Sequence, residues 1–555
     1  MIGVAINIEE REIVREFFEL FKTPWEFYRP EAQYEAVLFA RRDASARGVT
    51  ANLVIVYASQ ETPFDKQEEI EIICHRSTGT LCYRESRLPL YGDNITFRDK
   101  GVSILRDENS QQSAGLLVKS GHKVLVRIGY DLFREFRVLL TNGQPAENAS
   151  IPTLEVHIAL LRDLIVESGI RLVEIPPIPE GHTFIACLTH DVDHPLIRQH
   201  RWDHTIFGFL YRAIFGSLFS MLKGRASLRH LLTNWAAAAK LPFIYLGLAK
   251  DFWSEFDRYL EIENGLDSTF FVLPFKDRPG KTALGLAPRI RASGYGAVDI
   301  AARLQAFVSV GREVGLHGID AWIDSTKGLE EKTQITNITG AKNIGVRMHW
   351  LYFDENSPRE LERAGFTYDS TIGYNETIGY RVGTGQVYKP LQADHLLELP
   401  LHVMDTALFY PSYLNLSVVE ANRQVGLMID SAIQFGGAIT FNWHDRSIAP
   451  ERLWGEFYTS LINKLKQKGG WCTSAGGVVS WFHDRRSVVF TRADQGLEVA
   501  RRGISLDPRK DAPGLRLRVY NARRGGDNSS EPHLDLAFSG NMTICLDRHS
   551  LAIHG

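Results

Sequence analysis

The sequence predicts an α/β protein whose central part is a barrel of alternating strands and helices. Near-continuous apolar runs recur through residues 183–487, and amphipathic helical stretches lie between several of them. Apolar strands that alternate with helices indicate a parallel sheet buried on both faces. About seven such units fit a barrel better than an open sheet. The predicted strands are Phe184–Leu188, Ser268–Leu273, Glu313–Leu316, Ile344–Val346, Phe366–Tyr368, Leu396–Leu401 and Ala438–Asn442.

Two helices of this part are predicted from apolar residues that share one helical face. A pair of glycines at 469–470 ends the second helix. The first face consists of Ile300, Ala301, Leu304, Phe307 and Val308, and the second of Trp454, Phe457, Tyr458, Leu461, Ile462 and Leu465.

The chain is predicted to have three parts, because 555 residues exceed what one hydrophobic core usually serves. Residues 1–175 are expected to form an α/β domain in which no chemistry is visible. A proline-rich run at 174–181 is typical of a linker. Residues 183–487 form the barrel, with a helical insertion at about 196–245, and residues 488–555 form a small β-rich tail.

The composition narrows the function classes. The net charge is −3, the pI is about 6.7, and no run rich in lysine or arginine occurs, so nucleic acid is not expected as a partner. The five cysteines are sparse and lack metal-ligand spacing, which favours reduced thiols. The N-terminus does not resemble a secretory signal. We therefore expect a cytoplasmic protein; its oligomeric state is not predicted.

One apolar segment, residues 206–222, complicates this expectation. It reads IFGFLYRAIFGSLFSML, with Arg212 as its only charge, and is marginal for spanning a bilayer. The favoured interpretation is a buried or lid-like helical pair without a spanning helix. The alternative is an interfacial helix that contacts a membrane or a lipid carrier.

Polar side chains occur where the predicted apolar strands stop. In a parallel barrel the carboxyl ends of the strands meet at one rim. For a single residue, a surface or capping role is the simpler explanation, but five coincidences at equivalent points indicate a common site. These residues are Asp191 and Asp193 after the first strand, His317 after the third, Arg347 and His349 after the fourth, Asp369 and Ser370 after the fifth, and His444 after the seventh.

The residue types at these points suit amide hydrolysis. Imidazoles and carboxylates are the ligands of a catalytic metal ion that leaves room for water. Of two carboxylates spaced two residues apart, one can hold the metal while the other takes a proton from water. A histidine across the site can then protonate a leaving amine.

The motifs His190-Asp-Val-Asp193, Gly315-Leu-His-Gly318, Arg347-Met-His-Trp350 and Trp443-His444 resemble those of the polysaccharide deacetylase family (NodB-like, carbohydrate esterase family 4-type). The resemblance covers roughly residues 183–487 and is to the bacterial subgroup with an Asp-x-Asp first motif. It implies a distorted (β/α)7 barrel and a metal-dependent enzyme. The implied reaction removes acetyl groups from nitrogen or oxygen of a sugar or glycan, in surface polysaccharide biosynthesis.

The same resemblance implies roles for five residues. Asp191 is expected to be the general base, Arg347 to orient it, and His444 to be the general acid. Asp193 and His317 are expected to bind one divalent ion, with zinc the first choice and cobalt, nickel or manganese as alternatives. No organic cofactor is expected.

The chain departs from the family pattern at one position. The second motif usually carries another histidine four residues after the first, and in this chain that position is Ala321. A catalytic zinc normally has three protein ligands. We expect His349, at the next strand end, to be the third ligand, with Asp320 in reserve.

Two other functions stay open at this point. The same fold and metal could hydrolyse a non-sugar amide or imide. Alternatively, the missing histidine could mark an inactive barrel that serves as a glycan-binding or scaffold module. The presence of the other polar residues argues against the inactive module, because a cluster of buried polar groups is costly to keep without use.

Overall fold

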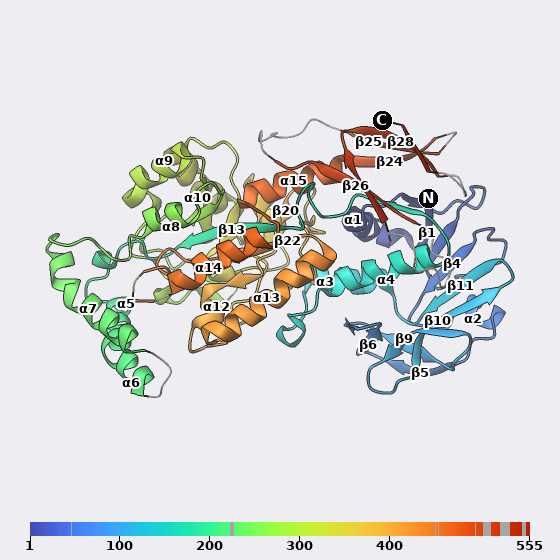
Figure 1. Ribbon diagram of the computed structural model, residues 1–555, viewed down its shortest axis with the longest axis horizontal. Coiled ribbons are helices and arrows are strands. Elements are labelled where there is room, and N and C mark those ends of the chain that lie inside the picture. The colour runs from blue at the N-terminus through green and yellow to red at the C-terminus, as the bar shows by residue number, and fades with distance from the viewer. Residues whose placement is uncertain are drawn as a thin grey trace.

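A computed structural model covers residues 1–555. It describes every residue except 46, 223–226, 283, 450, 453, 494–495, 503–511, 522–532, 547–550 and 555. The barrel is at the centre, the N-terminal sheet lies at one end, and the C-terminal strands lie beside both (Figure 1).

The N-terminal part is α/β, as predicted, and contains an 11-stranded sheet. Helices α1 (Arg11–Phe21), α3 (Leu132–Thr141) and α4 (Thr153–Glu167) contribute buried apolar side chains to its core. Its parallel strands are β1 (Ile2–Ile6), β2 (Trp25–Phe27), β3 (Ala36–Ala40), β4 (Leu53–Tyr57) and β11 (Lys123–Ile128). The sheet continues antiparallel through β10 (Ser113–Ser120), β9 (Val102–Asp107), β6 (Gly79–Tyr83) and β7 (Ser86–Leu90).

The central part contains a curled sheet in which every pairing is parallel, so the predicted fold class, a distorted (β/α) barrel, is confirmed. Along the sheet the strands are β20 (Leu397–Glu398), β19 (Tyr368–Asp369), β18 (Val346–Met348), β17 (Glu313–Gly318), β14 (Thr269–Val272), β13 (Phe184–Val192), β22 (Ala438–Asn442) and β21 (Val403–Met404). Apart from the half-buried Glu313 at the start of β17, the residues of these strands are buried, as the apolar runs predict.

One segment, residues 397–404, joins the two ends of this sheet. Its first part, β20, pairs with β19, and its last part, β21, pairs with β22. Between them, Leu401 N donates to Ile372 O and His402 N donates to Thr440 O, at 2.8 and 3.2 Å. A single stretch therefore bridges both edges, which makes the barrel irregular at this point.

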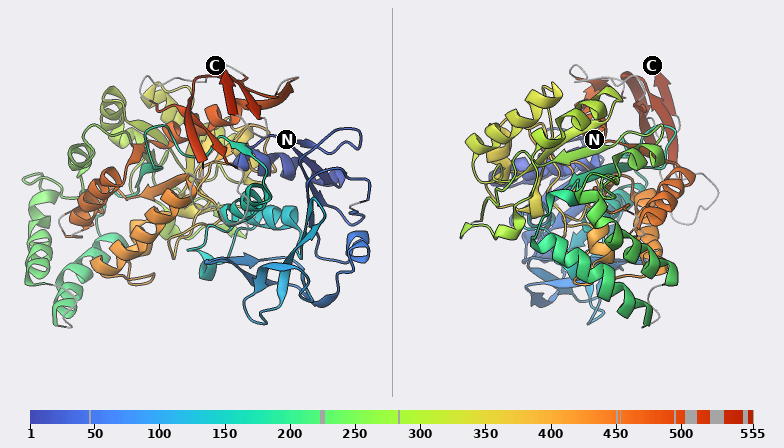
Figure 2. Two further views of the ribbon diagram at one scale, coloured as in Figure 1. Left: turned by 45° about the vertical axis from the view of Figure 1, so that its right-hand side comes forward. Right: turned by 90° about the vertical axis from the view of Figure 1, so that its left-hand side faces the viewer.

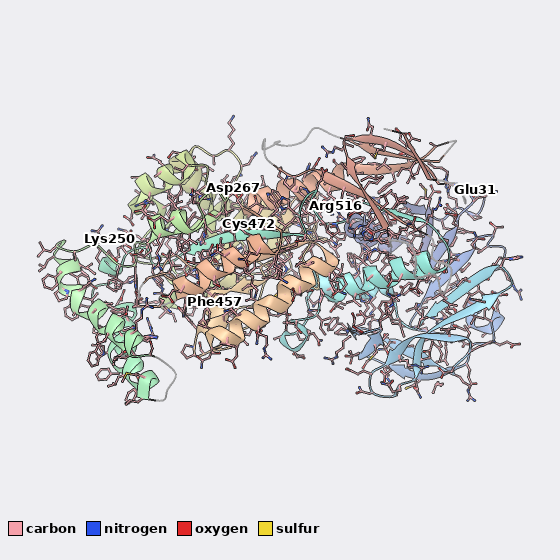
Figure 3. All side chains as sticks on the ribbon, in the orientation of Figure 1. Glu31, Lys250, Asp267, Phe457, Cys472 and Arg516 are labelled. Atoms are coloured by element: carbon pink, nitrogen blue, oxygen red, sulfur yellow. The ribbon has the colours of Figure 1, made fainter. Side chains whose placement is uncertain are left out.

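Helices cover the outside of the barrel and are held by their apolar faces. Both predicted faces fall on helices: α9 (Ala301–Ser309) and α14 (Trp454–Gln467). On α14, which carries Phe457 (labelled in Figure 3), the ring of Phe457 stacks on Trp443 with centroids 5.6 Å apart. Further helices in this layer are α10 (Ser325–Thr339), α13 (Val418–Phe435) and α15 (Ala475–Ser487). A strand that the pattern did not predict, β23 (Gly470–Thr473), pairs with β13.

The insertion after the first strand forms helices that project from the barrel: α5 (His204–Tyr211), a π-helical turn (Arg212–Gly216), α6 (Ser217–Leu222) and α7 (Leu228–Tyr245) (Figures 1 and 2). The favoured expectation for residues 206–222 is a buried or lid-like helical pair. The segment is helical, but its burial is only partial: Ile206, Phe209 and Ala213 are buried, whereas Phe207, Phe215 and Phe219 are each more than half exposed. Among the described residues, no helix is both long and apolar enough to cross a membrane.

The C-terminal strands pack against the barrel and the N-terminal part. The predicted strand around 514–520 is β26 (Leu515–Tyr520), and it pairs with β12 (Leu172–Glu174), which precedes the predicted linker. The second predicted strand is β28 (Asn541–Leu546). Cys74, Cys82, Cys187 and Cys472 are free thiols, whereas the side chain of Cys545 lies outside the described residues.

Candidate metal centre and active site

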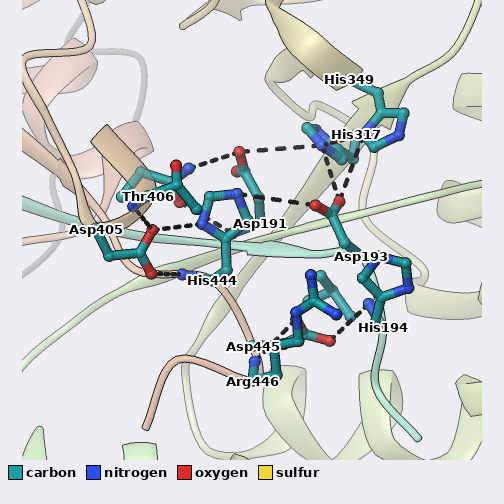
Figure 4. Close-up of polar contacts among 12 residues, drawn as sticks. Asp191, Asp193, His194, His317, His349, Asp405, Thr406, His444, Asp445 and Arg446 are labelled. Carbon is teal, nitrogen blue, oxygen red and sulfur yellow. Dashed lines mark hydrogen bonds and ion pairs between the residues drawn. The ribbon is translucent and has the colours of Figure 1, made fainter. Parts of the chain in front are cut away.

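The rim at the carboxyl ends of β13, β17 and β18 holds Asp193, His317 and His349 close together (Figure 4). One oxygen or nitrogen from each lies within 4.8 Å of the other two. Asp193 Oδ1 is 3.3 Å from His317 Nε2 and 3.4 Å from His349 Nδ1. The structure thus brings together the three residues that the sequence predicts as metal ligands.

The hydrogen bonds behind the two histidines set which ring nitrogens face the cluster. His317 Nδ1 is 2.9 Å from the carbonyl oxygen of Arg347, and His349 Nε2 is 3.0 Å from that of Arg291. Because a carbonyl only accepts, these outer nitrogens must carry the hydrogens. In the neutral rings, His317 Nε2 and His349 Nδ1 then present lone pairs to each other across 3.0 Å.

This arrangement fits a cation. Asp193 Oδ1 is buried and accepts no hydrogen bond from the described residues. Three electron-pair donors, Asp193 Oδ1, His317 Nε2 and His349 Nδ1, thus converge. When both histidines are neutral, none of these three atoms carries a hydrogen with which to bond another. Such an arrangement is repulsive unless a positive charge lies between the donors. Two imidazoles and one carboxylate are a common ligand set of catalytic zinc, and outer hydrogen bonds of this kind orient metal-binding histidines.

The reserve ligand, Asp320, is not part of this cluster. Its Oδ2 accepts from Lys327 Nζ at 3.1 Å, and its Oδ1 accepts from the backbone of Lys281. Ala321, at the position of the missing histidine, is fully buried. The position of the histidine that this chain lacks is therefore a packed core position, and His349 reaches the cluster from the neighbouring strand end.

Asp191 lies beside the cluster and is held from two sides. Arg347 Nη1 donates to its Oδ1 at 3.0 Å, and Asn442 Nδ2 donates to its Oδ2 at 2.7 Å. Burial by itself would raise the pKa of Asp191, but the positive charge of Arg347 and smaller contributions from His317 and His444 lower it below its usual value. Asp191 is therefore a carboxylate near neutral pH, 3.9 Å from His317.

Arg347 is fully buried in the barrel, and its hydrogen bonds fix its orientation. It donates to Thr189 Oγ1 at 2.7 Å and to the carbonyl and hydroxyl of Ser370 at 3.0 and 2.9 Å. Its guanidinium also lies over the ring of Phe271. Arg347 thus contacts Asp191 in the way expected of a residue that orients a base.

His444 approaches from the other side, after β22. Its Nε2 is 3.8 Å from Asp193 Oδ2, and its Nδ1 is 2.6 Å from Asp405 Oδ1. Burial would lower the pKa of His444, but the carboxylates of Asp405, Asp193 and Asp191 raise it to about 10. The side chain is therefore a protonated imidazole whose Nε2 points toward the cluster.

Sequence reasoning missed Asp405 and Asn442, which contact the predicted catalytic residues directly. Asp405 begins α12 (Asp405–Phe409) and also accepts from the backbone N–H of His444 at 2.7 Å. Asp405 follows the sixth predicted strand, Leu396–Leu401. It could therefore have been predicted from the expectation that functional polar residues lie just after the strand ends. Asn442 directly precedes the Trp443-His444 motif, where the same expectation applies.

These residues line one cavity of about 450 Å³. Its walls include the aromatic side chains of Trp350, Tyr352, Tyr410 and Tyr413, together with Arg291 and Arg446. Trp350 and Tyr413 are more than a third exposed. A cavity of this size, with convergent polar groups and aromatic walls, is typical of a small-molecule site.

No protein-family model and no curated protein matches the sequence. Among solved structures, a putative polysaccharide deacetylase from Mycobacterium smegmatis is 16% identical with a TM-score of 0.34, over 57% of this chain and 99% of that one. Agd3, described as a novel carbohydrate deacetylase, is 8% identical with a TM-score of 0.34, over 94% of this chain and 91% of that one. Puue allantoinase is 16% identical with a TM-score of 0.31, over 54% of this chain and 90% of that one.

Two of these three proteins are described as deacetylases. The TM-scores of all three lie below 0.5. The chain is a distorted (β/α) barrel protein, similar to polysaccharide deacetylases in its ordered rim motifs.

Proposed function

We propose that the chain is a metal-dependent hydrolase that removes acetyl groups from a sugar or glycan, with residues 183–487 as its catalytic unit. One observation carries the proposal: three metal-type ligands lie between a buried carboxylate and a histidine in a single cavity. Asp191 and His444 are both within 4 Å of residues in this cluster. Surface polysaccharide biosynthesis is the process that the family resemblance favours.

The ion would be held by Asp193 Oδ1, His317 Nε2 and His349 Nδ1. When bound there, a divalent ion acidifies a water molecule and polarises the carbonyl of the acetyl group. Zinc is the first choice because two histidines and one carboxylate form one of the three-ligand sets that catalytic zinc uses.

The protein's own groups then carry the proton transfers. Asp191 accepts a proton from the attacking water, whose oxygen bonds to the carbonyl carbon of the acetyl group. Arg347 and Asn442 hold the carboxylate of Asp191 and fix its direction. His444 donates the proton on Nε2 to the leaving nitrogen, or oxygen in an ester, as its bond to the carbonyl carbon breaks. The products are acetate and the free amine or alcohol.

Asp405 has a positioning role in this scheme. It accepts from both Nδ1 and the backbone N–H of His444. The imidazole is therefore fixed with Nε2 toward the cavity, in the same way that a carboxylate orients the histidine of a hydrolase triad.

The walls of the cavity suit a sugar. Trp350 and Tyr413 present partly exposed rings at its edge, and Asn375 and Ser447 add polar groups. Aromatic faces pack against the apolar faces of a ligand, while the polar groups bind hydroxyls. Trp350 is held in a left-handed backbone conformation with φ 63°, which a residue of this kind rarely adopts.

We further propose that the projecting helices bind the surface of an anionic membrane. Thirteen large apolar side chains between Trp202 and Leu248 are exposed, out of twenty-nine in the described part of the chain. The sequence from residue 196 to Lys250 (Figure 3) carries eight lysines and arginines but only one acidic residue, in a chain whose net charge is −3. Exposed apolar residues among basic ones are typical of interfacial helices.

The proposed activity is tested by acetate release. The zinc-loaded full chain is expected to release acetate from N-acetylated oligosaccharides, and a chelator is expected to abolish the release. The Asp191→Asn variant should bind the metal without turnover. Metal binding with no acetate release from N- or O-acetylated glycans would contradict the deacetylase and favour a non-sugar amide substrate. A wild-type chain that binds no divalent metal would favour the glycan-binding module.

A further inference from the structure

Two arginines follow His444 along the chain and lie beside the cavity. Arg446, labelled in Figure 4, lines the cavity. Its guanidinium packs over the ring of Trp253, 5.0 Å from the centroid. Arg452 packs over Tyr410 and Trp454, at 5.2 and 4.9 Å. The flat faces of both guanidiniums are thus fixed by aromatic rings, which leaves their N–H edges free to donate.

These N–H edges converge on one hydroxyl. Arg446 Nη2 is 3.4 Å and Arg452 Nη2 is 3.3 Å from Tyr410 Oη, and Tyr410 also lines the cavity. Both contacts are longer than a good charge-assisted hydrogen bond. Two permanently charged groups therefore share a single phenolic oxygen as acceptor.

No carboxylate of the described residues lies within 4.0 Å of the guanidinium nitrogens of Arg446 or Arg452. The nearest acidic groups along the chain have other partners. Asp445 accepts from the backbone N–H groups of His194 and Arg446, and Glu451 accepts from Trp253 Nε1 at 2.7 Å. Positive charge from two half-buried arginines is therefore concentrated beside the cavity without a direct ion pair among the described residues. Asp445 and Asp193 stabilise the charge of Arg446 only from a longer distance.

Arg212, an exposed arginine of the projecting helices, is close enough to sense these charges. Partial desolvation of its guanidinium, followed by the positive charges of Arg452 and Arg446, lowers the pKa of Arg212 to about 10. Arg452 and Arg446 also lower the pKa of Tyr410 to about 7, although burial by itself would raise it. Both shifts agree with the geometry in indicating a positive potential at this edge of the cavity.

The loop with these arginines also anchors the projecting helices. Asn234 of α7 donates to the carbonyl of Glu451 at 3.1 Å, and Phe209 of α5 packs against Trp253, the ring that supports Arg446. The structure therefore places three kinds of surface in one order: the cavity with the metal-type cluster, then the arginines, then the exposed apolar helices. A sugar joined to a hydrocarbon chain through phosphate has the same order of chemical groups.

We propose that Arg446 and Arg452, with the hydroxyl of Tyr410, form a subsite for a phosphoryl group on the sugar substrate. This inference rests on the proposed function, because it names the class of sugar that the hydrolase takes. Guanidinium groups donate two parallel hydrogen bonds to phosphate oxygens, and two of them match the charge of a phosphoryl group. The phosphoryl group belongs either to a lipid-linked sugar or to a free sugar phosphate.

Direct anion binding tests the subsite independently of any activity. The probe is inorganic pyrophosphate, titrated into the full chain by calorimetry, once with zinc and once with excess chelator. We expect binding under both conditions, weakened roughly tenfold or more in Arg446→Gln and in Arg452→Gln, since each removes charged hydrogen bonds. Arg423→Gln, an exposed arginine on α13, is the matched control and should bind like the wild type.

Equal affinity in the wild type and both variants would overturn the subsite, as would binding that disappears with chelator, because the anion would then sit on the metal. Arg446→Lys guards against misfolding: it keeps the charge and should bind more tightly than Arg446→Gln. A chain that binds pyrophosphate at the arginines but releases no acetate would support the phosphoryl subsite. It would contradict only the proposed deacetylase activity.

A second arm separates the two sources of the phosphoryl group. The probes are neutral phosphatidylcholine vesicles doped with a prenyl-phosphate-linked N-acetyl sugar, and the same sugar 1-phosphate free in solution. Tighter binding of the doped vesicles would assign the subsite to a lipid-linked sugar, and tighter binding of the free sugar phosphate would assign it to a free one. If Arg446→Gln and Arg452→Gln bind both probes as the wild type does, the subsite is refuted.

Discussion

His317 Nε2 and His349 Nδ1 lie 3.0 Å apart, yet in the neutral rings neither nitrogen has a hydrogen to give the other. Their hydrogens are on the opposite nitrogens, held by the carbonyl oxygens of Arg347 and Arg291. Asp193 Oδ1 lies 3.3 Å from His317 Nε2 and 3.4 Å from His349 Nδ1. The three atoms are therefore placed to bind one cation between them.

The first prediction concerns that site. His349→Ala and His317→Ala should each weaken zinc binding by more than roughly 100-fold, beyond the loss seen for outer-shell partners, and lose activity in parallel. Asp191→Asn should keep the metal and lose turnover, because its carboxylate faces the cluster but is held by Arg347 and Asn442. Metal content is measured on purified protein. His395→Ala, an exposed histidine, serves as the control; full zinc occupancy in His349→Ala would contradict the assignment.

The second prediction concerns Asp405. Asp405→Asn removes the carboxylate that accepts from His444 Nδ1, so the imidazole loses both its orientation and the charge that raises its pKa. We expect kcat to fall by roughly 10² to 10⁴, the usual contribution of general acid catalysis, with metal content unchanged. Asp430→Asn, an exposed aspartate paired with Lys468, is the control. Loss of metal together with kcat would mean that Asp405 supports the cluster instead.

The third prediction is spectroscopic. Because Arg452 and Arg446 lower the pKa of Tyr410 to about 7, this phenol should be neutral below pH 7 and become a phenolate above it. Absorbance near 295 nm should therefore rise through one ionisation around pH 7, well below the usual tyrosine pKa of about 10. Tyr410→Phe should lose this transition, Arg452→Gln should move it to higher pH, and Tyr413→Phe should retain it. A wild-type chain without ionisation below pH 9 would refute the positive potential proposed at this edge.

The fourth prediction concerns the projecting helices. The full chain should bind vesicles that contain a third of anionic lipid, more weakly as salt rises, because basic residues contribute part of the affinity. Phe215→Ser together with Phe219→Ser should reduce the bound fraction in a flotation assay several-fold. Leu427→Ser, an exposed leucine on α13, should leave it unchanged. If the double variant instead abolishes a dimer and the wild type ignores vesicles, the apolar surface binds a second copy of the chain.

Much of the fold could be predicted from residue order because period and composition reflect local burial. Each of the seven predicted barrel strands overlaps a strand of the structure, and both predicted helical faces fall on helices. The strand β23 (Gly470–Thr473) was not predicted because it begins at the second residue of a glycine pair, and such a pair normally ends an element. The exposure of the segment 206–222 could not be predicted, since an apolar run has the same composition whether protein, lipid or water covers it.

The residues of the site could be predicted from the sequence, but most of their contacts could not. Asp191, Asp193, His317, His349 and His444 were predicted from the sequence alone, because parallel strands place their carboxyl ends on one rim whatever the loops between them do. The tertiary structure alone decided which of them touch, and through which atoms. Asp405 meets His444 across 39 residues of chain and Asn442 meets Asp191 across 251, distances over which no periodicity extends. The grouping of Arg446 and Arg452 around Tyr410 beside the projecting helices likewise depends on how the loops pack, because contacts between distant segments are set by the shape of the folded core and not by local pattern.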